Sequence, residues 1–304
     1  MKRVAWITDN IYLKHDTGKQ HPESIERLIS INLKIKTVID RLIEIKPRFA
    51  TIEDIAMVHE KSLIKKVKNS SENEIPIDLD TILSKESYRS ALKAVGAGLE
   101  AIDGIKKNKF DRAFCAVRPP GHHATPTQSM GFCLFNNIAI TAKYAQKQGY
   151  KKVMIIDFDV HHGNGTQDAF YADKSVFYFS THQAYAFPGT GNPKDIGRGV
   201  GEGYTMNFPL MPDSTDIEIL ENYHEDLPKA YEFFKPDIIL VSAGYDLHES
   251  DPLAQLNITT NGIKEIVRSI LDLGDKPIVF MLEGGYSVTD LGWNVVTTVK
   301  EMFR

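Results

Sequence analysis

In one stretch of the chain an apolar run leads directly into acids and histidines: Ile155-Ile156-Asp157-Phe158-Asp159-Val160-His161-His162-Gly163-Asn164-Gly165. The apolar, largely β-branched residues 153–156 predict a short buried strand that ends there. Because side chains alternate between the two faces of an extended chain, Asp157, Asp159 and His161 are expected on one side. Carboxylate oxygens and an imidazole nitrogen that converge at a strand end suit a divalent metal ion. The stretch therefore predicts a metal site, and the simpler alternative is a capped strand end with solvated acids.

Length and composition predict an ordinary globular protein with one domain over 1–304. The chain has 304 residues, 42% of them hydrophobic and 25% charged, and its net charge of −4 provides no basic surface for nucleic acid. Its two cysteines, Cys115 and Cys133, lie in apolar surroundings and favour a reducing compartment. The first apolar run covers only residues 4–7, which is too short for a signal peptide, and no run reaches transmembrane length. We therefore expect a cytoplasmic protein without a membrane partner.

Strand and helix patterns alternate along most of the chain. This alternation predicts a single α/β domain with a mostly parallel central sheet and helices on both faces. The expected strands are 3–8, 113–117, 153–156, 176–179, 204–208, 238–241 and 278–282. The expected helices are 24–44, 87–107, 136–148, 167–171, 215–233, 260–271 and 291–302, with two short helices within 52–67 and a loop over 69–80.

The densest polar motifs each follow a predicted strand. In a parallel α/β sheet, ligands bind at the carboxyl ends of the strands, so loops that are far apart in sequence meet there. We therefore expect these motifs to form one site. They are Arg118-Pro119-Pro120-Gly121-His122-His123, Asp157 to Asn164, Ser180-Thr181-His182, Ala243-Gly244-Tyr245-Asp246 and Glu283-Gly284-Gly285-Tyr286.

Three of these side chains have the character of metal ligands. Asp159, His161 and Asp246 would leave one coordination position open for water and substrate, as catalytic zinc requires. Two carboxylates also suit Fe(II), Mn or Co, so the ligand set alone leaves the metal open.

The other motifs provide proton-transfer groups. His122 and His123 are adjacent imidazoles on a proline-stiffened loop, and either could take a proton from water at the metal. A carboxylate or amide partner would fix the ring tautomer, with Asp157 and Asn164 as candidates. Tyr286 could donate its hydroxyl to a developing oxyanion. Together these groups predict metal-assisted hydrolysis of an amide or ester.

This set of motifs resembles the histone deacetylase and acetylpolyamine amidohydrolase family, which implies an arginase/deacetylase-like fold. Asn164 and Glu283 are more similar to the class II branch and its bacterial relatives than to class I. The matching segments are HPESIERL at 21–28, VHEKSLI at 58–64, RPPGHHA at 118–124, GFCLFNN at 131–137, DFDVHHGNGTQ at 157–167, FPGTG at 187–191, SAGYDLHESDPL at 242–253 and LEGGY at 282–286.

The resemblance implies roles for the central residues. It implies zinc on the three ligands named above. His123 would be the general base, and His122 the second histidine, paired with Asp157. Tyr286 would polarise the carbonyl group of the acetyl substrate.

The resemblance also implies a narrow tunnel for an acetylated alkylammonium chain. Phe132 and Phe187 would form its walls, with Gly131 alongside, because aromatic walls suit a methylene stem that gains by leaving water. Asp80 matches an acid that in some members holds the substrate backbone at the rim. Leu253 stands where the polyamine-selective eukaryotic members place a Glu, which argues against that mode of polyamine selection without excluding polyamines.

Two structural potassium sites are implied as well. The first would use the side chain of Asp157, the backbone of Asp159 and His161, and Ser180 and Thr181. The second would lie around Phe170, Asp173, Val176 and Tyr204.

We therefore expect a metal-dependent deacylase for an acylated amine that is either a small molecule or part of a peptide, and a homo-oligomer is compatible with the sequence. One alternative is an arginase-like dimanganese hydrolase, which would need a second set of bridging aspartates. Another is a catalytically silent acyl-lysine-binding protein, against which the retained His122, His123 and Tyr286 argue.

Overall fold

An eight-stranded sheet forms the centre of the computed structural model, which describes residues 1–304. Its order is β2-β1-β3-β8-β7-β4-β5-β6, and every neighbouring pair is parallel. The expected parallel α/β architecture is therefore confirmed. The strands are β1 (Val4–Ile7), β2 (Leu42–Ile45), β3 (Arg112–Cys115), β4 (Val153–Asp157), β5 (Val176–Gln183), β6 (Thr205–Leu210), β7 (Ile238–Ala243) and β8 (Ile278–Leu282).

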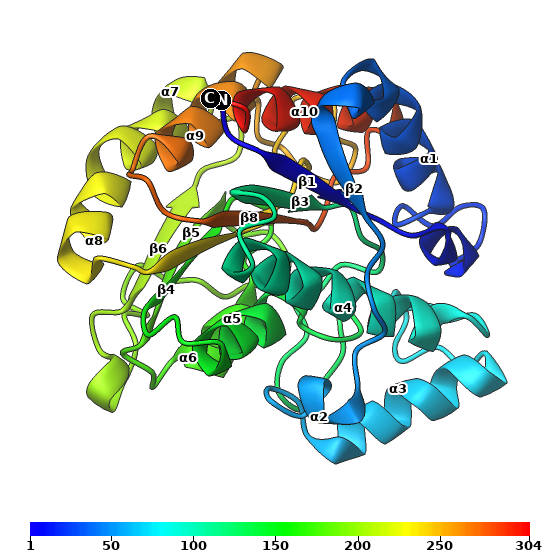
Figure 1. Ribbon diagram of the computed structural model, residues 1–304. Coiled ribbons are helices and arrows are strands. Elements are labelled where there is room, and N and C mark those ends of the chain that lie inside the picture. Colours follow the sequence, from blue (N-terminus) through cyan, green and yellow to red (C-terminus); the bar gives the residue numbers. More distant parts are fainter.

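Helices cover both faces of this sheet (Figure 1). One face carries α1, α10, α9 and α7, and the other carries α4, α5 and α6, with α2 and α3 beyond α4. The apolar residues between these layers form one cluster of 80 buried side chains. The helices are α1 (Ile25–Lys34), α2 (Ile52–Ile55), α3 (Lys61–Asn73), α4 (Ser87–Lys106), α5 (Asn137–Lys147), α6 (Asn164–Phe170), α7 (Asp216–Glu221), α8 (Leu227–Phe234), α9 (Thr260–Leu271) and α10 (Val288–Glu301).

Local sequence explains where these elements begin. Every residue of β4, β7 and β8 is buried, which accounts for their near-continuous apolar sequences. The side chain of Asn136 caps α5 by accepting the Ala139 N–H at 2.9 Å. Thr259 caps α9 in the same way by accepting the Gly262 N–H at 3.0 Å. Such caps satisfy donors that the first helical turn leaves free.

Four expected elements differ clearly from the structure. The strand expected over 176–179 continues as β5 to Gln183, so Ser180, Thr181 and His182 lie within this strand and not after it. The helix expected over 24–44 ends at Lys34, and after two short 3-10 turns the chain forms strand β2, which pairs with β1. Helix α3 extends to Asn73, into the expected loop. The helix expected over 215–233 is divided into α7 and α8 by a π-helical turn at Asn222–Asp226.

The two ends of the chain lie together at the sheet edge where the strands begin. The Lys2 N–H donates to the Phe303 carbonyl at 3.2 Å, just before β1 starts and just after α10 ends. Among the helices, none combines the length and the apolar character needed to cross a bilayer.

Candidate active site

The predicted site residues meet at the carboxyl ends of four adjacent strands. The loop after β3 carries the two imidazoles, the loop after β8 carries Tyr286, and those after β7 and β4 carry the three metal-ligand candidates. These strands are consecutive in the sheet order β3-β8-β7-β4. The topology thus assembles residues 164 positions apart, from His122 to Tyr286, over the central part of one edge.

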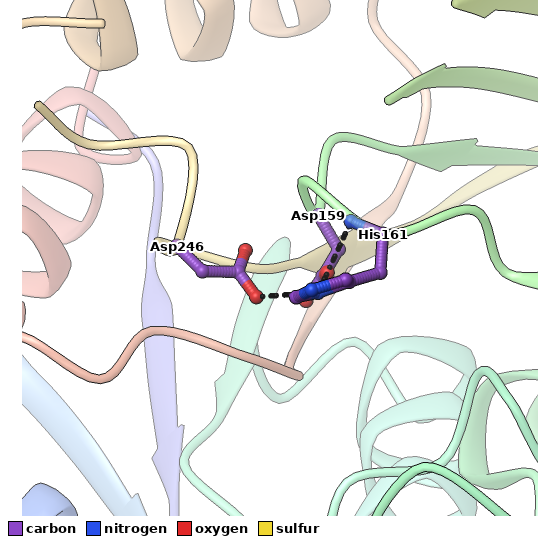
Figure 2. A group of neighbouring side chains, drawn as sticks. All are labelled: Asp159, His161 and Asp246. Carbon is purple, nitrogen blue, oxygen red and sulfur yellow. Dashed lines mark hydrogen bonds and ion pairs between the residues drawn. The ribbon is translucent and has the colours of Figure 1, made fainter. Parts of the chain in front are cut away.

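The three metal-ligand candidates converge as expected. One donor atom from each of Asp159, His161 and Asp246 lies within 4.8 Å of the other two. Nδ1 of His161 is 3.2 Å from Oδ1 of Asp159 and 3.1 Å from Oδ2 of Asp246. Figure 2 shows the imidazole beside both carboxylates. All three are buried or nearly so.

The orientation of the two carboxylates is fixed by backbone amides. Asp159 accepts the His161 N–H at 2.9 Å and the Gly284 N–H at 2.7 Å, and Asp246 accepts the Val160 N–H at 3.0 Å. A Cβ atom at position 284 would lie 2.1 Å from Oδ2 of Asp246, so only glycine allows this approach. Such backbone contacts hold ligand oxygens in place.

The charge of this cluster fits a bound cation. Burial and the neighbouring Asp159 raise the pKa of Asp246 to about 7, because two carboxylates are close together away from water. A divalent ion would relieve that repulsion, and two oxygens with one imidazole nitrogen are a donor set that zinc or Fe(II) accepts. The residues present therefore fit a divalent metal ion.

Asp157 does not join this triad. Strand β4 ends at Asp157, and the chain then turns, so the expected alternation of faces does not continue through His161. One Asp157 oxygen accepts the Asp159 N–H at 3.1 Å, and the other contacts Nδ1 of His122 at 3.0 Å and the Tyr178 hydroxyl at 3.1 Å. Asp157 is thus the hydrogen-bond partner of His122, which is the pairing expected for these two residues.

The two imidazoles differ in their electrostatic environment. Burial alone would lower the pKa of His122, but Asp159 and Asp157 overcome it and raise that pKa to about 10. For His123, burial and the neighbouring His122 and His161 lower the pKa well below its ordinary value. His122 is therefore the charged member of the pair and His123 the neutral one.

Asn164 defines the tautomer of His123. Its Oδ1 lies 2.9 Å from Nδ1 of His123, and an amide oxygen accepts only, so the ring proton is on Nδ1. Nε2 of His123 is then unprotonated and able to accept a proton. This is the arrangement that a general base needs.

Tyr286 lies across the same space. Its ring meets that of Phe132 edge-on at 5.9 Å, and the guanidinium of Arg27 is 5.0 Å from its centroid. Burial and Asp246 raise the pKa of Tyr286 well above its ordinary value, so the phenol keeps its proton. It can therefore act as a hydrogen-bond donor.

One cavity of about 230 Å³ brings His123, Tyr286 and the metal-ligand candidate His161 together with the substrate-binding candidates. A Cβ at Gly131 would lie 2.6 Å from the His123 ring and 2.8 Å from that of Phe187, so glycine keeps this passage open. At the mouth, the Asp80 carbonyl contacts His21 at 2.8 Å, and His21 packs edge-on against Phe132 at 4.7 Å. The cavity is lined by Asp80, His123, Gly131, Phe132, His161, Phe187, Leu253 and Tyr286.

The residues predicted for the first potassium site lie beside the metal triad. Asp157 and Ser180 are register partners on β4 and β5. The Ser180 hydroxyl contacts His182 at 3.0 Å, and the Thr181 hydroxyl contacts Tyr223 at 3.1 Å. Their assignment to potassium stays a prediction.

The residues predicted for the second potassium site gather at the turn between α6 and β5. The Asp173 N–H donates to the Phe170 carbonyl at 2.9 Å, and the Val176 N–H donates to the Asp173 carbonyl at 3.4 Å. The Tyr204 carbonyl accepts the Tyr178 N–H at 2.9 Å. Here too the ion stays a prediction.

Sequence reasoning assigned no role to several buried charges around the site. Glu283 accepts the Gly121 and His122 N–H groups at 2.6 and 3.1 Å, which anchors the histidine loop. Asp251 accepts the Tyr286 N–H at 2.6 Å. In a second buried charge cluster, Glu23 lies 2.9 Å from Arg27 and 2.6 Å from Arg118. These residues belong to the HPESIERL and RPPGHHA segments that match the family.

Comparison with known proteins finds one protein family along most of the chain. The model of the histone deacetylase domain matches residues 21–302. The chain is 41% identical over 303 residues to "Histone deacetylase 10, chloroplastic" of Oryza sativa subsp. japonica, covering 94% of this chain and 68% of that protein. It is 38% identical over 285 residues to "Probable deacetylase" of Archaeoglobus fulgidus, covering 91% and 79%. The crystal structure of the HDA15 HD domain matches with a TM-score of 0.95 and 33% identity, covering 98% and 88%.

Proposed function

Because the chain belongs to the histone deacetylase family, we propose that it is a metal-dependent amidohydrolase that removes acetyl or other short acyl groups from amines such as acetyl-lysine or acetylpolyamines. One observation carries the proposal: a neutral imidazole, a protonated phenol and the metal-ligand candidate His161 line the same cavity of about 230 Å³. Each of these groups serves amide hydrolysis, and together they surround a space the size of a small acyl group and its stem.

Asp159, His161 and Asp246 would hold the metal ion, with zinc proposed and Fe(II) as the alternative. Such an ion supplies Lewis-acid chemistry and lowers the pKa of water. Asp159 and Asp246 are oriented for this role by the amides of Gly284 and Val160. A structural potassium ion at each of the two predicted positions forms part of the proposal.

The protonation states of the two imidazoles suggest which group accepts and which donates each proton. His123, with Nε2 free, takes a proton from the attacking water. Tyr286 donates its hydroxyl to the carbonyl oxygen as negative charge develops there. His122, held by Asp157, is the charged imidazole and stands beside His123, so the pair can return a proton to the leaving amine.

The tunnel favours an unbranched stem. Phe132 and Phe187 offer aromatic surface to methylene groups, and Gly131 leaves room between His123 and Phe187. Asp80 and Leu253 stand at the mouth, where a substrate backbone or a second amine would lie. Placement in the cytoplasm and assembly into a homo-oligomer stay predictions, and the rice relative bears the word "chloroplastic" in its name.

Two alternatives make different predictions. A silent acyl-lysine-binding protein would bind the substrate without turnover; the presence of both His123 and Tyr286 in the cavity wall argues against it. An arginase-like hydrolase would need two metal ions, whereas a single group of three donors gathers in this structure.

The proposal is tested with purified protein stripped of metal by a chelator and reloaded with Zn²⁺ or, without oxygen, Fe²⁺. We expect one transition-metal ion per chain and metal-dependent release of acetate from a panel of acetyl-lysine peptides, free acetyl-lysine, acetylputrescine, acetylspermidine and longer acyl-lysines. Asp246→Ala should lose both metal and activity. Binding of acyl-lysine without turnover in the metal-loaded protein would contradict the proposal and favour the silent binding protein. Two bound manganese ions with turnover of arginine would favour the arginase-like hydrolase.

A further inference from the structure

One buried carboxylate links the loop that carries Asp246 to the loop that carries Tyr286. Oδ2 of Asp251 accepts the N–H groups of Tyr286 at 2.6 Å and Ser287 at 3.2 Å. Its Oδ1 accepts the N–H of Leu253 at 3.0 Å. Asp251 is 7% exposed, so water offers little competition for these three contacts.

Further contacts join the same two loops. Tyr245, which directly precedes the metal-ligand candidate Asp246, donates its N–H to the Gly284 carbonyl at 3.1 Å. The Ser250 hydroxyl lies 2.9 Å from that of Ser287. The loops therefore form one unit, and the side chain of Asp251 bridges them through backbone N–H groups.

Tyr286 depends on this unit for its position. The hydrogen bond that holds Tyr286 is made by its main chain to Asp251. The peptide between Gly285 and Tyr286 is held from two sides: its carbonyl accepts from Nε of the buried Arg27 at 2.6 Å, and its N–H donates to Asp251. Without the carboxylate, this peptide would keep only its contact with Arg27, and the phenol could shift within the cavity.

We propose that Asp251 is a positioning residue for the hydrolysis: its carboxylate fixes the main chain of Tyr286, and so places the phenol opposite His123. The inference rests on the proposed amidohydrolase function. Misplacement of a catalytic group by about 1 Å can lower a rate by about 10²-fold, so a single anchor can have a large effect.

The test is a double-mutant cycle on metal-loaded enzyme with an acetyl-lysine peptide, measuring kcat and KM separately. Tyr286→Phe should lower kcat by about 10²–10³-fold. Asp251→Ala should lower kcat by about 10–10²-fold, because the misplaced Tyr286 hydroxyl stabilises the transition state less well. KM should change by about twofold or less, because the hydroxyl contributes little to binding of the ground state. If Asp251 acts through the phenol, the double variant should be no more than about twofold slower than Tyr286→Phe alone.

Asp251→Asn provides the conservative variant, and it keeps the test open if the alanine variant does not fold. The single amide oxygen of asparagine can accept either from Tyr286 and Ser287 or from Leu253, so its kcat should lie between those of wild type and alanine. Asp237→Ala is the matched control. Its carboxylate accepts the Lys151 and Lys152 N–H groups at 2.7 and 2.9 Å at the opposite edge of the sheet, so its loss should lower stability and leave kcat unchanged.

Equal kcat losses for an Asp251 variant with and without Tyr286→Phe would overturn the positioning role, as would an effect on KM or thermal stability alone. Both outcomes leave the proposed function standing, since Tyr286→Phe would still show its own loss. Wild-type kcat in Tyr286→Phe would instead remove the phenol from the mechanism, and the positioning role with it.

Discussion

Nδ1 of His123 lies 2.9 Å from Oδ1 of Asn164, so a neutral amide, not a carboxylate, supports the base. Replacement of Asn164 by Asp should keep the hydrogen bond and add a negative charge, which raises the pKa of His123. A base with a higher pKa stays protonated up to a higher pH. The acidic limb of the kcat/KM profile should therefore move to higher pH by about one unit or more. An unmoved limb would mean that another group titrates there.

Gly131 separates the His123 ring from Phe187. A Cβ at this position would lie 2.6 and 2.8 Å from these rings, and the residue has φ +54°. Gly131→Ala should lower kcat/KM by at least about tenfold, because displaced cavity walls misplace the substrate.

Gly149→Ala is the control for Gly131→Ala, because it introduces backbone strain without crowding any neighbouring side chain. Gly149 also has positive φ, +107°, but a Cβ there would meet nothing within 4 Å. Gly149→Ala should lose about 1–2 kcal/mol of unfolding free energy from backbone strain and keep its activity. Gly131→Ala should lose about 1–3 kcal/mol more from crowding, and only this variant should lose activity. Matching activity losses would show that crowding is not the cause.

Leu253 occupies the cavity mouth and is 43% exposed. Leu253→Glu places a negative charge where the second amine of an acetylpolyamine would lie. The ratio of kcat/KM for acetylspermidine to that for a neutral acetylated amine should rise about three- to tenfold, and salt should weaken the effect. Leu253→Gln, similar in shape but neutral, should leave the ratio unchanged. An equal rise in both variants would exclude an electrostatic origin.

The site could be predicted from sequence more fully than the elements around it. Acids and histidines directly after apolar runs identify strand ends, and a parallel sheet brings those ends together, so the triad and the imidazoles required no knowledge of helix positions. Strand β2 was missed because Ile31, Ile35, Ile39 and Ile43 continue a helical spacing. Its four residues are a strand only because they pair with β1, and that pairing is tertiary.

The role of Asp251 could not be predicted for a related reason. Its partners are backbone N–H groups, two of them on a loop 35 and 36 residues further along. Any residue except proline offers the same backbone N–H group, so no sequence motif can indicate this contact. Glu283 matches the family by its residue type, yet its hydrogen bonds with the Gly121 and His122 N–H groups likewise appear only in the folded structure.

Glu23 is fully buried between two guanidinium groups. It lies 2.6 Å from Nε of Arg118 and 2.9 Å from Nη1 of Arg27. Glu23→Ala would leave two buried cations without their partner and should lower the free energy of unfolding by about 3–5 kcal/mol. In the control, Glu86→Ala removes the exposed pair with Arg89 and should lose less than about 1 kcal/mol in the same urea titration. Similar losses in both variants would contradict this assignment.

His59 makes stability depend on pH. Burial lowers its pKa to about 4, and its Nε2 accepts the Asn136 N–H at 2.8 Å while Nδ1 donates to the Thr125 carbonyl at 2.9 Å. The folded pKa is below the unfolded value of about 6.5, so the unfolded chain takes up the proton first as pH falls. The contribution is complete above about pH 6.5, and up to about 3 kcal/mol is lost on descending to about pH 4.

Urea unfolding across this range checks the prediction for His59. His59→Gln cannot titrate there, so its unfolding free energy should fall less steeply with decreasing pH than that of the wild type. His182, whose pKa burial also lowers to about 4, is unchanged in the variant and leaves a residual slope. Identical slopes in the two proteins would assign the acid sensitivity to other groups.

The contact between Lys2 and Phe303 has a practical consequence for handling the molecule. Both ends leave from the edge where the strands begin, whereas the cavity opens at the edge where they finish. A tag, a surface tether or a fused partner on either end would therefore point away from arriving substrate. Joining the ends with a short linker and opening the chain at an exposed loop should give a circularly permuted enzyme whose catalytic face is undisturbed.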